Sequence, residues 1–281
     1  MHIGVFYPDD NKEHLKMLLA FAKGLKYLNI DHEFLPLREY RPVDMAVVFG
    51  VGKKNVPASY ARGAVIAQQK LRGMPFIVIE KGYVKRDIYY AVGLGGLNGR
   101  AYFRNENMPP DRWTNLGVEM KPWKLSTEGH VLVCGQVPHD ASVQHINFYQ
   151  WCDHIIKLIR QHTDKTIRFR PHPLANFPDI PRFKDAELSF HRNFREDIEN
   201  ASSVVTFNSN AGVDAVINGI PAYAFDIGSM IKDVANNDIE TINNPKIFDR
   251  NQWAADIAYT QWNEYEFERG LPWLHLLGKA K

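Results

Sequence analysis

Short apolar runs alternate with longer amphipathic stretches along the first 80 residues of the chain. Residues 11–28 and 59–72 carry apolar side chains at helical spacing, so both stretches are predicted as helices. The segments around them are short, mostly apolar and predicted as strands: 3–7, 31–37, 45–49 and 76–80. Strands that are apolar on both faces and separated by helices are typical of a parallel sheet covered on both sides. The pattern therefore predicts an α/β, doubly wound unit.

The same pattern returns in the second half after an interruption. Residues 94–127 contain glycines, prolines and two tryptophans, and are interpreted as loop-rich surface that leads to a linker. The predicted elements that follow are strands at 130–134, 167–170, 204–207 and 222–226 and helices at 142–162, 194–200 and 211–218. Residues 249–281 are predicted to be helical, with their three tryptophans in the core. The sequence thus predicts two Rossmann-like domains, 1–126 and 127–250, followed by a helical segment, 251–281.

The charge pattern divides the chain along the same border. The 281 residues are 45% hydrophobic and 23% charged, which is typical of soluble globular proteins, and the net charge is +2. Residues 1–125 hold 19 Lys and Arg against 12 Asp and Glu, a net charge of +7, whereas the rest holds 15 against 20, a net charge of −5. A basic half next to an acidic half indicates different roles, and the basic half is expected to meet an anionic partner.

Cysteine content and apolar runs indicate the compartment. Two cysteines, Cys134 and Cys152, are too few for a disulfide framework, which favours a reducing environment. The first residues lack the pattern of a signal peptide, and no apolar run approaches the roughly 18 residues of a membrane span. The protein is therefore predicted to be cytoplasmic.

The first candidate site is the motif RFRPHP at residues 168–173, at the end of a predicted strand. Ligands of doubly wound sheets bind beyond the carboxyl ends of the strands, so Arg170 and His172 are expected to face the ligand crevice. A guanidinium forks onto phosphate oxygens and an imidazole donates to them, which suits a diphosphate. The alternative is a rigid turn with a surface histidine.

Two further candidates follow predicted strands in the same half. Asn208, Ser209 and Asn210 stand where a helix begins, so free backbone N–H groups and small polar side chains converge into an anion site. Gly212 is expected to let a ligand approach the backbone, and Asp214 lies in the first helical turn. Plain helix capping is the alternative. Gly135 and Gln136, after another strand, are a weaker phosphate or ribose signal that also fits a simple turn.

The fourth candidate is the charged segment 80–87 in the basic half. Glu80 and Asp87 are candidate general bases, because a carboxylate at a strand end can take a proton from a bound hydroxyl. Neighbouring cations are candidate anion contacts: Lys81, Lys85, Arg86 and Arg100. A solvated charged loop is the alternative.

The sequence lacks the motifs of several common active sites. There is no phosphate-binding GxxxxGK[ST] motif, no dinucleotide-type GxGxxG, no GxSxG nucleophile elbow and no zinc-binding HExxH. The two cysteines lack the spacing of metal ligands, so no metal site is predicted.

Together, RPHP and the stretch VVTFNSNAGVDAVINGIPAYAFD resemble the C-terminal domain of GT-B glycosyltransferases. The likeness extends over about residues 130–230, and it is greatest to the capsule-polysaccharide and sialyl/Kdo-transferase type and to phage glycosyltransferases. It implies two α/β domains facing across a cleft, with the acceptor on the first and the sugar nucleotide on the second. It also implies a last helix that crosses back to the first domain and no bound metal.

The resemblance assigns residues to the donor, a UDP- or CMP-sugar. His172 would act on the departing phosphate, and Asp214 stands where the family has an acidic ribose ligand. The remaining expected donor contacts are Gly135, Gln136, Arg170, Asn208, Ser209, Asn210 and Gly212.

The sequence therefore predicts a metal-independent glycosyltransferase in which Asp87 or Glu80 deprotonates an acceptor hydroxyl. The resemblance to phage glycosyltransferases implies a hydroxymethylated pyrimidine in phage DNA, in the host cytoplasm, as the preferred acceptor, and the net charge of +7 in the first half favours DNA. The expected DNA contacts are Lys53, Lys54, Lys81, Lys85, Arg86, Arg100, Arg104 and Arg112. The alternatives are a polysaccharide acceptor, a nucleotide-sugar epimerase, and a non-catalytic protein that binds DNA or nucleotides.

Overall fold

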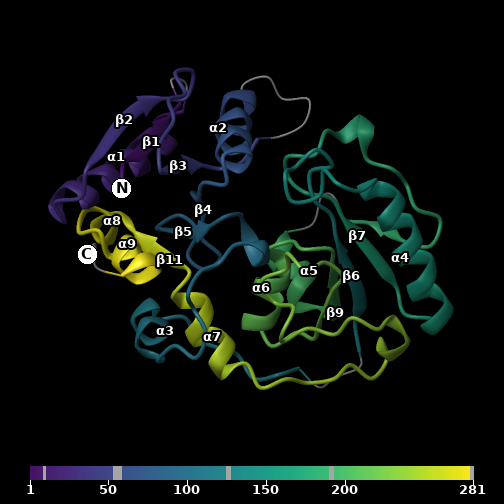
Figure 1. Cartoon of the computed structure of the whole chain (residues 1–281). Coiled ribbons are helices and arrows are strands. Elements are labelled where there is room, and N and C mark those ends of the chain that lie inside the picture. Colours follow the sequence, from purple (N-terminus) through teal and green to yellow (C-terminus); the bar gives the residue numbers. More distant parts are fainter. Residues whose placement is uncertain (9–10, 53–58, 125–127, 190–192, 279–281) are drawn as a thin grey trace. The chain divides into compact units, whose positions relative to one another are not determined.

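The structure is a computed structural model that describes residues 1–8, 11–52, 59–124, 128–189 and 193–278. The chain divides into two compact units. Met1–Leu116 and Ala254–Lys281 form unit 1, and Gly117–Trp253 form unit 2. The border expected at residues 126/127 falls outside the described ranges. Each unit contains one sheet with flanking helices (Figure 1), which confirms the predicted pair of Rossmann-like α/β folds.

Unit 1 is built on a six-stranded sheet with the order β11-β5-β4-β3-β1-β2. The four strands β1 to β4 run parallel, whereas β5 and β11 are antiparallel to their neighbours. The strands are β1 (Ile3–Tyr7), β2 (His32–Pro36), β3 (Met45–Phe49), β4 (Phe76–Lys81), β5 (Tyr89–Leu94) and β11 (Gln261–Asn263). The first four follow the predicted strands to within a residue at each end. The apolar runs of β1, β3 and β4 are buried, whereas β2, at the edge of the sheet, is mostly half-buried.

Helices cover both faces of this sheet. Ile3 and Val5 pack in one core with α1 and the C-terminal helices, and Ala46 and Val48 pack in another core with α2. The helices of the unit are α1 (Lys12–Tyr27), α2 (Tyr60–Leu71), α3 (Asp111–Leu116), α8 (Glu264–Glu268) and α9 (Leu271–Leu277), and α7 (Asn251–Ala258) precedes β11. No helix within the described ranges is long and apolar enough to cross a bilayer.

The C-terminal segment differs from the continuous helix that the sequence predicted. β11 interrupts it and pairs with β5, and Gly270, with a φ of +69°, separates α8 from α9. The segment packs directly on α1, where a Cβ on Gly24 would collide with the backbone of Phe267 and Gly270. The prediction that the tryptophans are core residues is confirmed, since Trp253, Trp262 and Trp273 are all buried.

Unit 2 is built on a five-stranded, fully parallel sheet with the order β10-β9-β6-β7-β8. Its strands are β6 (His130–Cys134), β7 (Ile167–Arg170), β8 (Glu187–Leu188), β9 (Ala201–Thr206) and β10 (Ala222–Ala224). Counted from β6, this is the order 3-2-1-4-5 of a doubly wound sheet. β6 and β7 have the predicted bounds, whereas β8 was not predicted.

Helices again lie on both faces, as Figure 1 shows. The helices are α4 (Phe148–His162), α5 (Phe194–Glu199) and α6 (Ala211–Ile217), and short 3₁₀ helices lie at Asn98–Arg100 in unit 1 and at Phe177–Asp179 and Ile239–Thr241 in unit 2. Ile167 and Phe169 pack in one core with α4. Because strand side chains alternate, Arg168 and Arg170 point to the opposite face, which α5 covers.

Candidate functional site

The strand order of unit 2 determines where a ligand crevice can form. The chain leaves β6 toward β7 and β8 on one side, then crosses to β9 and β10 on the other. β6 and β9 therefore flank a topological switch point, beyond whose carboxyl ends such sheets bind ligands. The residues after these strands are Gly135 and Gln136 on one side and Phe207 to Asn210 on the other. Both segments are candidate sites in the sequence, and the fold places them next to each other.

A buried network of amides connects the two segments. Asn208 Oδ1 accepts a hydrogen bond of 2.8 Å from Gln136 Nε2, which is also 3.1 Å from Ser142 Oγ. Asn208 Nδ2 donates to the Ser142 carbonyl at 3.0 Å and to Asp226 Oδ2 at 2.7 Å. Asn208 and Gln136 are 6% and 8% exposed. Burial makes each of these bonds costly to lose, so the network fixes the shape of the switch point.

An aspartate and a histidine extend this network toward solvent. Asp226, just after β10, also accepts the Gly228 N–H at 3.0 Å. Its Oδ1 lies 3.9 Å from Nε2 of His145, whose side chain is 45% exposed against 7% for Asp226. The imidazole packs against the Phe207 ring with centroids 5.8 Å apart. Sequence reasoning missed both residues. Asp226 carried a usable signal, a polar residue at a strand end, whereas His145 lies in a long connection and carried none.

The other polar residues at this turn lie around the start of α6. Ser209 and Asn210 are half-buried, and Ser209 Oγ accepts the Ala211 N–H at 3.3 Å. Asp214 lies in the first turn of α6, as the sequence predicted. Gly212 packs against Ile231, whose Cδ1 would lie 2.6 Å from a Cβ at this position. Its role in letting a ligand approach the backbone stays a prediction.

Gly135 has a similar packing role. Its N–H donates to the Arg170 carbonyl at 2.7 Å, and a Cβ would lie 3.0 Å from the Phe169 ring and 3.1 Å from Pro171 Cα. The absence of a side chain lets the ends of β6 and β7 come together. Gln136, the next residue, is the member of this pair that belongs to the polar network.

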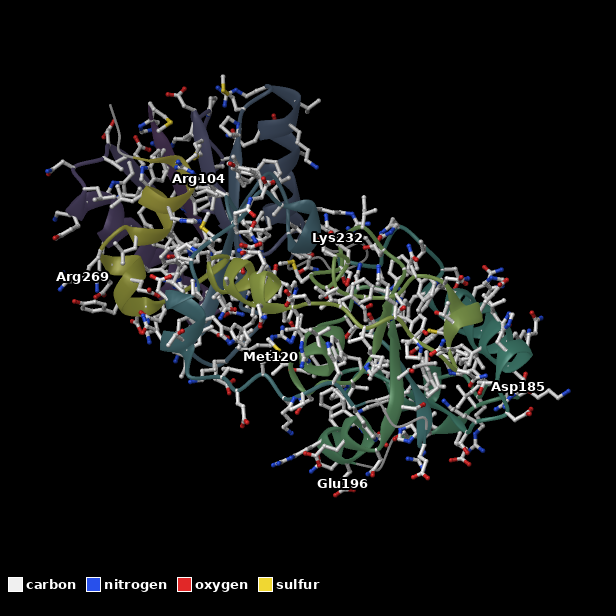
Figure 2. All side chains as sticks on the ribbon, turned by 90° about the horizontal axis from the view of Figure 1, so that it is seen from below. Arg104, Met120, Asp185, Glu196, Lys232 and Arg269 are labelled. Carbon is white, nitrogen blue, oxygen red and sulfur yellow. The ribbon has the colours of Figure 1, made fainter. Side chains whose placement is uncertain are left out.

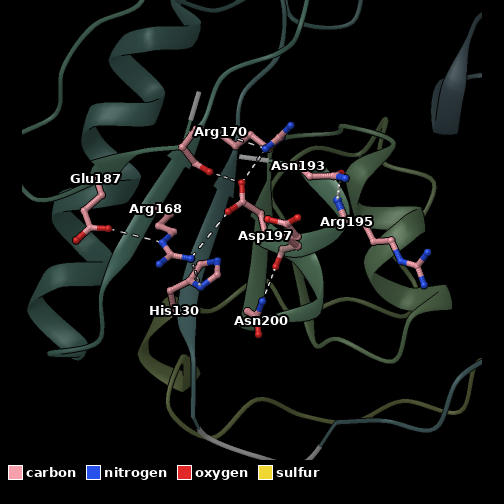
Figure 3. A network of polar contacts seen from close by, with 10 residues as sticks. His130, Arg168, Arg170, Glu187, Asn193, Arg195, Asp197 and Asn200 are labelled. Atoms are coloured by element: carbon pink, nitrogen blue, oxygen red, sulfur yellow. Dashed lines mark hydrogen bonds and ion pairs between the residues drawn. The ribbon is translucent and has the colours of Figure 1, made fainter. Parts of the chain in front are cut away.

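Arg170 is held in an ion pair inside unit 2. Figure 3 shows its guanidinium beside Asp197 of α5, with Nη1 2.7 Å from Oδ2. Asp197 is fully buried, also accepts the Ser189 hydroxyl, and lies 3.9 Å from Nη1 of Arg168. The Arg170 side chain is 15% exposed, and its guanidinium lies 5.4 Å from the centre of the Phe194 ring. The charge of Arg170 is therefore balanced by the Asp197 carboxylate, which the RFRPHP motif does not predict.

His172 lies in the turn after β7 and is half-buried. Its Nδ1 accepts the Leu174 N–H at 3.1 Å, and its carbonyl accepts the Ala175 N–H at 2.9 Å. The imidazole therefore closes its own turn, the structural role that the sequence left open as an alternative.

At the carboxyl edge of the unit 1 sheet, Glu80 and Lys81 end β4. Glu80 Oε1 and Arg62 Nη1 lie 3.0 and 2.8 Å from the position of a Cβ on Gly50, whose φ is +72°. Gly50 therefore leaves room for a carboxylate and a guanidinium at one point of the edge. Sequence reasoning selected Glu80 but missed Arg62.

Next to them, Lys81 Nζ forms an ion pair with Glu13 of α1, and Tyr90 donates a hydrogen bond of 2.6 Å to the same carboxylate oxygen. Partial burial would raise the pKa of Glu13, but the bonds from Lys81 and Tyr90 outweigh it and lower that pKa. Partial burial of Tyr90 and its hydrogen bond with the Glu13 carboxylate raise the pKa of Tyr90. Lys81, expected to contact an anion, is thus paired with a carboxylate that sequence reasoning missed.

Asp87 lies nearby, exposed, in the connection from β4 to β5. It lines a cavity of about 520 Å³ whose other lining residues are Lys16, Met17, Ile88, Tyr90, Asn263, Glu264, Tyr265 and Glu268. All of these belong to unit 1, and they come from α1, β5, β11, α8 and the connection that holds Asp87.

The remaining expected DNA contacts have different environments. Arg112 forms an ion pair of 2.6 Å with Glu266, is 16% exposed, and stacks 3.9 Å from the centre of the Trp262 ring. Arg104 lies beside the C-terminal segment (Figure 2) and donates to the His275 carbonyl at 3.2 Å. Arg104 is exposed, as are Lys85, Arg86 and Arg100. Lys53 and Lys54 lie outside the described residues.

No metal site is evident in the part of the chain that the structure describes, where no three His, Cys, Asp or Glu side chains converge to hold an ion. Cys134 and Cys152 are buried and unpaired with each other, and burial raises the pKa of the Cys134 thiol to about 12.

No family model matches the sequence, and no curated protein matches it either. The solved structures that are similar to this chain include two that cover nearly all of it with a TM-score above 0.5. They are KpsC proteins of Thermosulfurimonas dismutans, a β-Kdo 2,7-transferase and a β-Kdo 2,4-transferase. The match to the first is 14% identical and covers 98% of this chain and 99% of the 2,7-transferase chain. The match to the second is 11% identical and covers 97% of this chain and 98% of the 2,4-transferase chain. Both superpose with a TM-score of 0.58. The chain therefore has the GT-B type of fold, with two Rossmann-like domains.

Proposed function

We propose that the protein is a glycosyltransferase that moves a sugar from a nucleotide-sugar donor to an acceptor hydroxyl. The buried network of Gln136, Asn208 and Asp226 carries this proposal. It lies at the switch point of unit 2, the position at which sheets of this order bind nucleotides. The likeness of fold to two Kdo transferases supports the reaction class.

In the proposed reaction, unit 2 binds a CMP- or UDP-sugar and stabilises the phosphate as it departs. Asn208 holds the turn so that the side chains of Ser209 and Asn210 and nearby N–H groups can donate to phosphate oxygens. Preorganised donors of this kind stabilise developing charge because they need no reorganisation during the reaction. His145, backed by Asp226, is a second imidazole for this role beside His172. The protein would then need no metal to balance the leaving charge.

Unit 1 is proposed to bind the acceptor and supply the base. Asp87 and Glu80 are the two candidates from the sequence, and each lies at the carboxyl edge of the unit 1 sheet. A carboxylate takes the proton of the acceptor hydroxyl as the new glycosidic bond forms. Asp87 is the better placed of the two, because it is exposed and lines a cavity.

DNA as the acceptor stays a prediction. Lys85, Arg86 and Arg100 are exposed and support it, but Lys81 and Arg112 are paired with Glu13 and Glu266. A duplex would also have to expose or flip the modified base. Binding to hydroxymethylated duplex DNA should weaken steeply between 50 and 200 mM salt, roughly tenfold or more, if several phosphates are contacted. A transfer reaction without salt dependence indicates a saccharide acceptor instead.

The donor proposal is tested by binding of CMP, UDP and a panel of their sugar conjugates to the intact protein. We expect one nucleotide family to raise the melting temperature, since a ligand at a hundredfold excess over its Kd stabilises by about 2.7 kcal/mol. Asn208→Ala should abolish the shift. Asn218→Ala is the matched control, because its amide only caps α6 through the Asp214 carbonyl. If no nucleotide shifts the wild type, or Asn208→Ala responds like wild type, the proposal fails.

A further inference from the structure

The cavity at the carboxyl edge of the unit 1 sheet has the size of a ligand site. Its volume of about 520 Å³ lies within the range of ligand pockets, roughly 300 to 1,000 Å³. Three segments that are distant in sequence contribute to it: α1, the connection from β4 into β5, and the end of β11 with α8. β4 ends on this side of the sheet, where doubly wound folds bind their ligands.

The charges of the cavity are largely balanced within the protein. Lys16 Nζ lies 2.5 Å from Glu264 Oε2, and Lys23 Nζ lies 2.7 Å from Glu268 Oε1. Two of the three carboxylates that line the cavity are thus neutralised by lysines. The third, Asp87, forms no ion pair with any described residue. A ligand therefore meets one unpaired carboxylate and no excess of cations, which disfavours phosphates and other anions.

The rest of the lining combines apolar surface with an amide. Tyr265 and Ile88 are 61% and 55% exposed, large values for side chains of this size. Arg269 lies 4.3 Å from the centre of the Tyr265 ring, which orients that ring. Asn263 Oδ1 caps α8 by accepting the Glu266 N–H at 3.0 Å, and its Nδ2 has no partner among the described residues. A sugar offers C–H faces to such a ring and hydroxyls to such polar atoms.

We propose that this cavity binds an uncharged, hydroxyl-rich saccharide as the acceptor, an inference that rests on the proposed glycosyltransferase function. Tyr265 packs against the C–H face of a sugar ring, Asp87 accepts a hydrogen bond from a hydroxyl, and Asn263 Nδ2 donates to another hydroxyl. The site selects against sialylated glycans and DNA, because their anionic groups would lie beside Asp87, and the cation among the lining residues, Lys16, is already paired with Glu264.

The experiment is binding of the full-length protein to an array of neutral, amino-bearing and sialylated oligosaccharides, with a hydroxymethylcytosine duplex as a further probe. We expect a subset of neutral glycans to bind, and Tyr265→Ala and Asp87→Asn each to weaken that binding at least tenfold. Tyr27→Ala is the matched control, since Tyr27 is 63% exposed on α1 and does not line the cavity. Thermal melts confirm that each variant is folded.

Three outcomes would overturn the inference: no neutral glycan binds, sialylated glycans or the duplex bind more tightly, or Tyr265→Ala binds like wild type. The nucleotide melts on the same samples separate this failure from failure of the proposed function. If a nucleotide binds and no neutral glycan does, the saccharide site is wrong and the donor site stands. If neutral glycans bind but no sugar nucleotide is consumed in their presence, the proposed function is wrong and the saccharide site stands.

Discussion

The carboxyl edges of the two sheets differ in how their polar side chains are held. In unit 2, Asn208 is 6% exposed and bonds to Gln136, Ser142 and Asp226. In unit 1, the ion pair of Lys81 and Glu13 has side chains 35% and 42% exposed. A buried, partnered network keeps one geometry, whereas an exposed pair is weakly held. The polar side chains at the edge of unit 2 are thus held more firmly than those at the edge of unit 1.

The two units also differ in how they bury charge. Unit 2 places one fully buried carboxylate, Asp197, between two arginines of β7. Unit 1 uses a partly exposed pair, Arg112 and Glu266, to attach α3 to the C-terminal segment. Comparing substitutions at the two places shows which unit depends more on its internal charges.

The largest effect is expected for Asp197→Ala. Removing the carboxylate leaves Arg168 and Arg170 close together without their common partner, and breaking a buried ion pair from one side costs about 3–5 kcal/mol. Urea unfolding measured by circular dichroism gives the free energy of unfolding. Asp153→Ala is the control, because its exposed pair with Lys157 is of the kind worth only about 0.3–0.5 kcal/mol. Equal losses in the two variants would show that Asp197 has no special role.

A smaller loss is expected for Arg112→Ala in unit 1. The guanidinium bonds to both oxygens of Glu266 and to the Gln261 carbonyl, so we expect destabilisation of about 2 kcal/mol, typical of hydrogen bonds that involve charge. Arg112→Lys should restore only part of it, since an ammonium cannot form the forked pair. The same urea titrations measure both. If Arg112→Ala leaves stability unchanged but weakens DNA binding, Arg112 is a DNA contact, as the sequence predicted.

The elements that the sequence predicted well are those whose evidence is local. β1, β3 and β6 are short, mostly apolar runs, β7 alternates apolar residues with arginines, and the bounds of all four agree with the prediction. The chain around β5 and β11 gave weaker signals. β5 contains Gly93 between charged and glycine-rich segments, and β11 is three residues long inside a stretch of helical character. β5 pairs with β4 on one side and with β11 on the other. β11 is about 170 residues from β5 in the chain, and such distant pairing has no local pattern.

The candidate sites show the same limit. Strand-end positions such as Gln136 and Asn208 could be selected from sequence, because the fold brings such positions to one edge. The environment of Arg170 could not be predicted from the sequence. Its partner Asp197 lies in α5, and β8 separates α5 from β7 along the chain. His145 was missed because only the tertiary fold places it beside Asp226. Sequence reasoning thus located the edges, and tertiary contacts decide which side chains there are already occupied.

Substitutions of two histidines of unit 2, His145 and His172, test which side chain contacts the leaving phosphate. His145→Ala should slow sugar transfer at least tenfold, equivalent to about 1.4 kcal/mol, because an imidazole supported by Asp226 can donate to the leaving phosphate. His172→Ala should have a smaller effect on the rate, since its ring accepts the Leu174 N–H. Steady-state kinetics with the donor found in the melts measures both. A larger loss of transfer rate for His172→Ala would indicate that the phosphate is contacted by the RPHP motif instead.

The smallest expected effect is on the pH dependence of stability, and it concerns His275 in unit 1. Burial lowers the pKa of His275 below its usual 6.5, although a bond to the Phe103 carbonyl acts in the opposite direction. The unfolded chain therefore binds a proton more readily than the folded one once the pH falls below about 6.5. The stability that the neutral ring contributes is present above that pH and is lost as the pH falls from there through the lowered pKa. His275→Gln cannot take up this proton, so its free energy of unfolding should fall less than that of wild type between pH 8 and pH 5. Urea titrations at both pH values, referenced to pH 8, give the difference, and parallel losses would mean that His275 is protonated equally in the folded and unfolded chain.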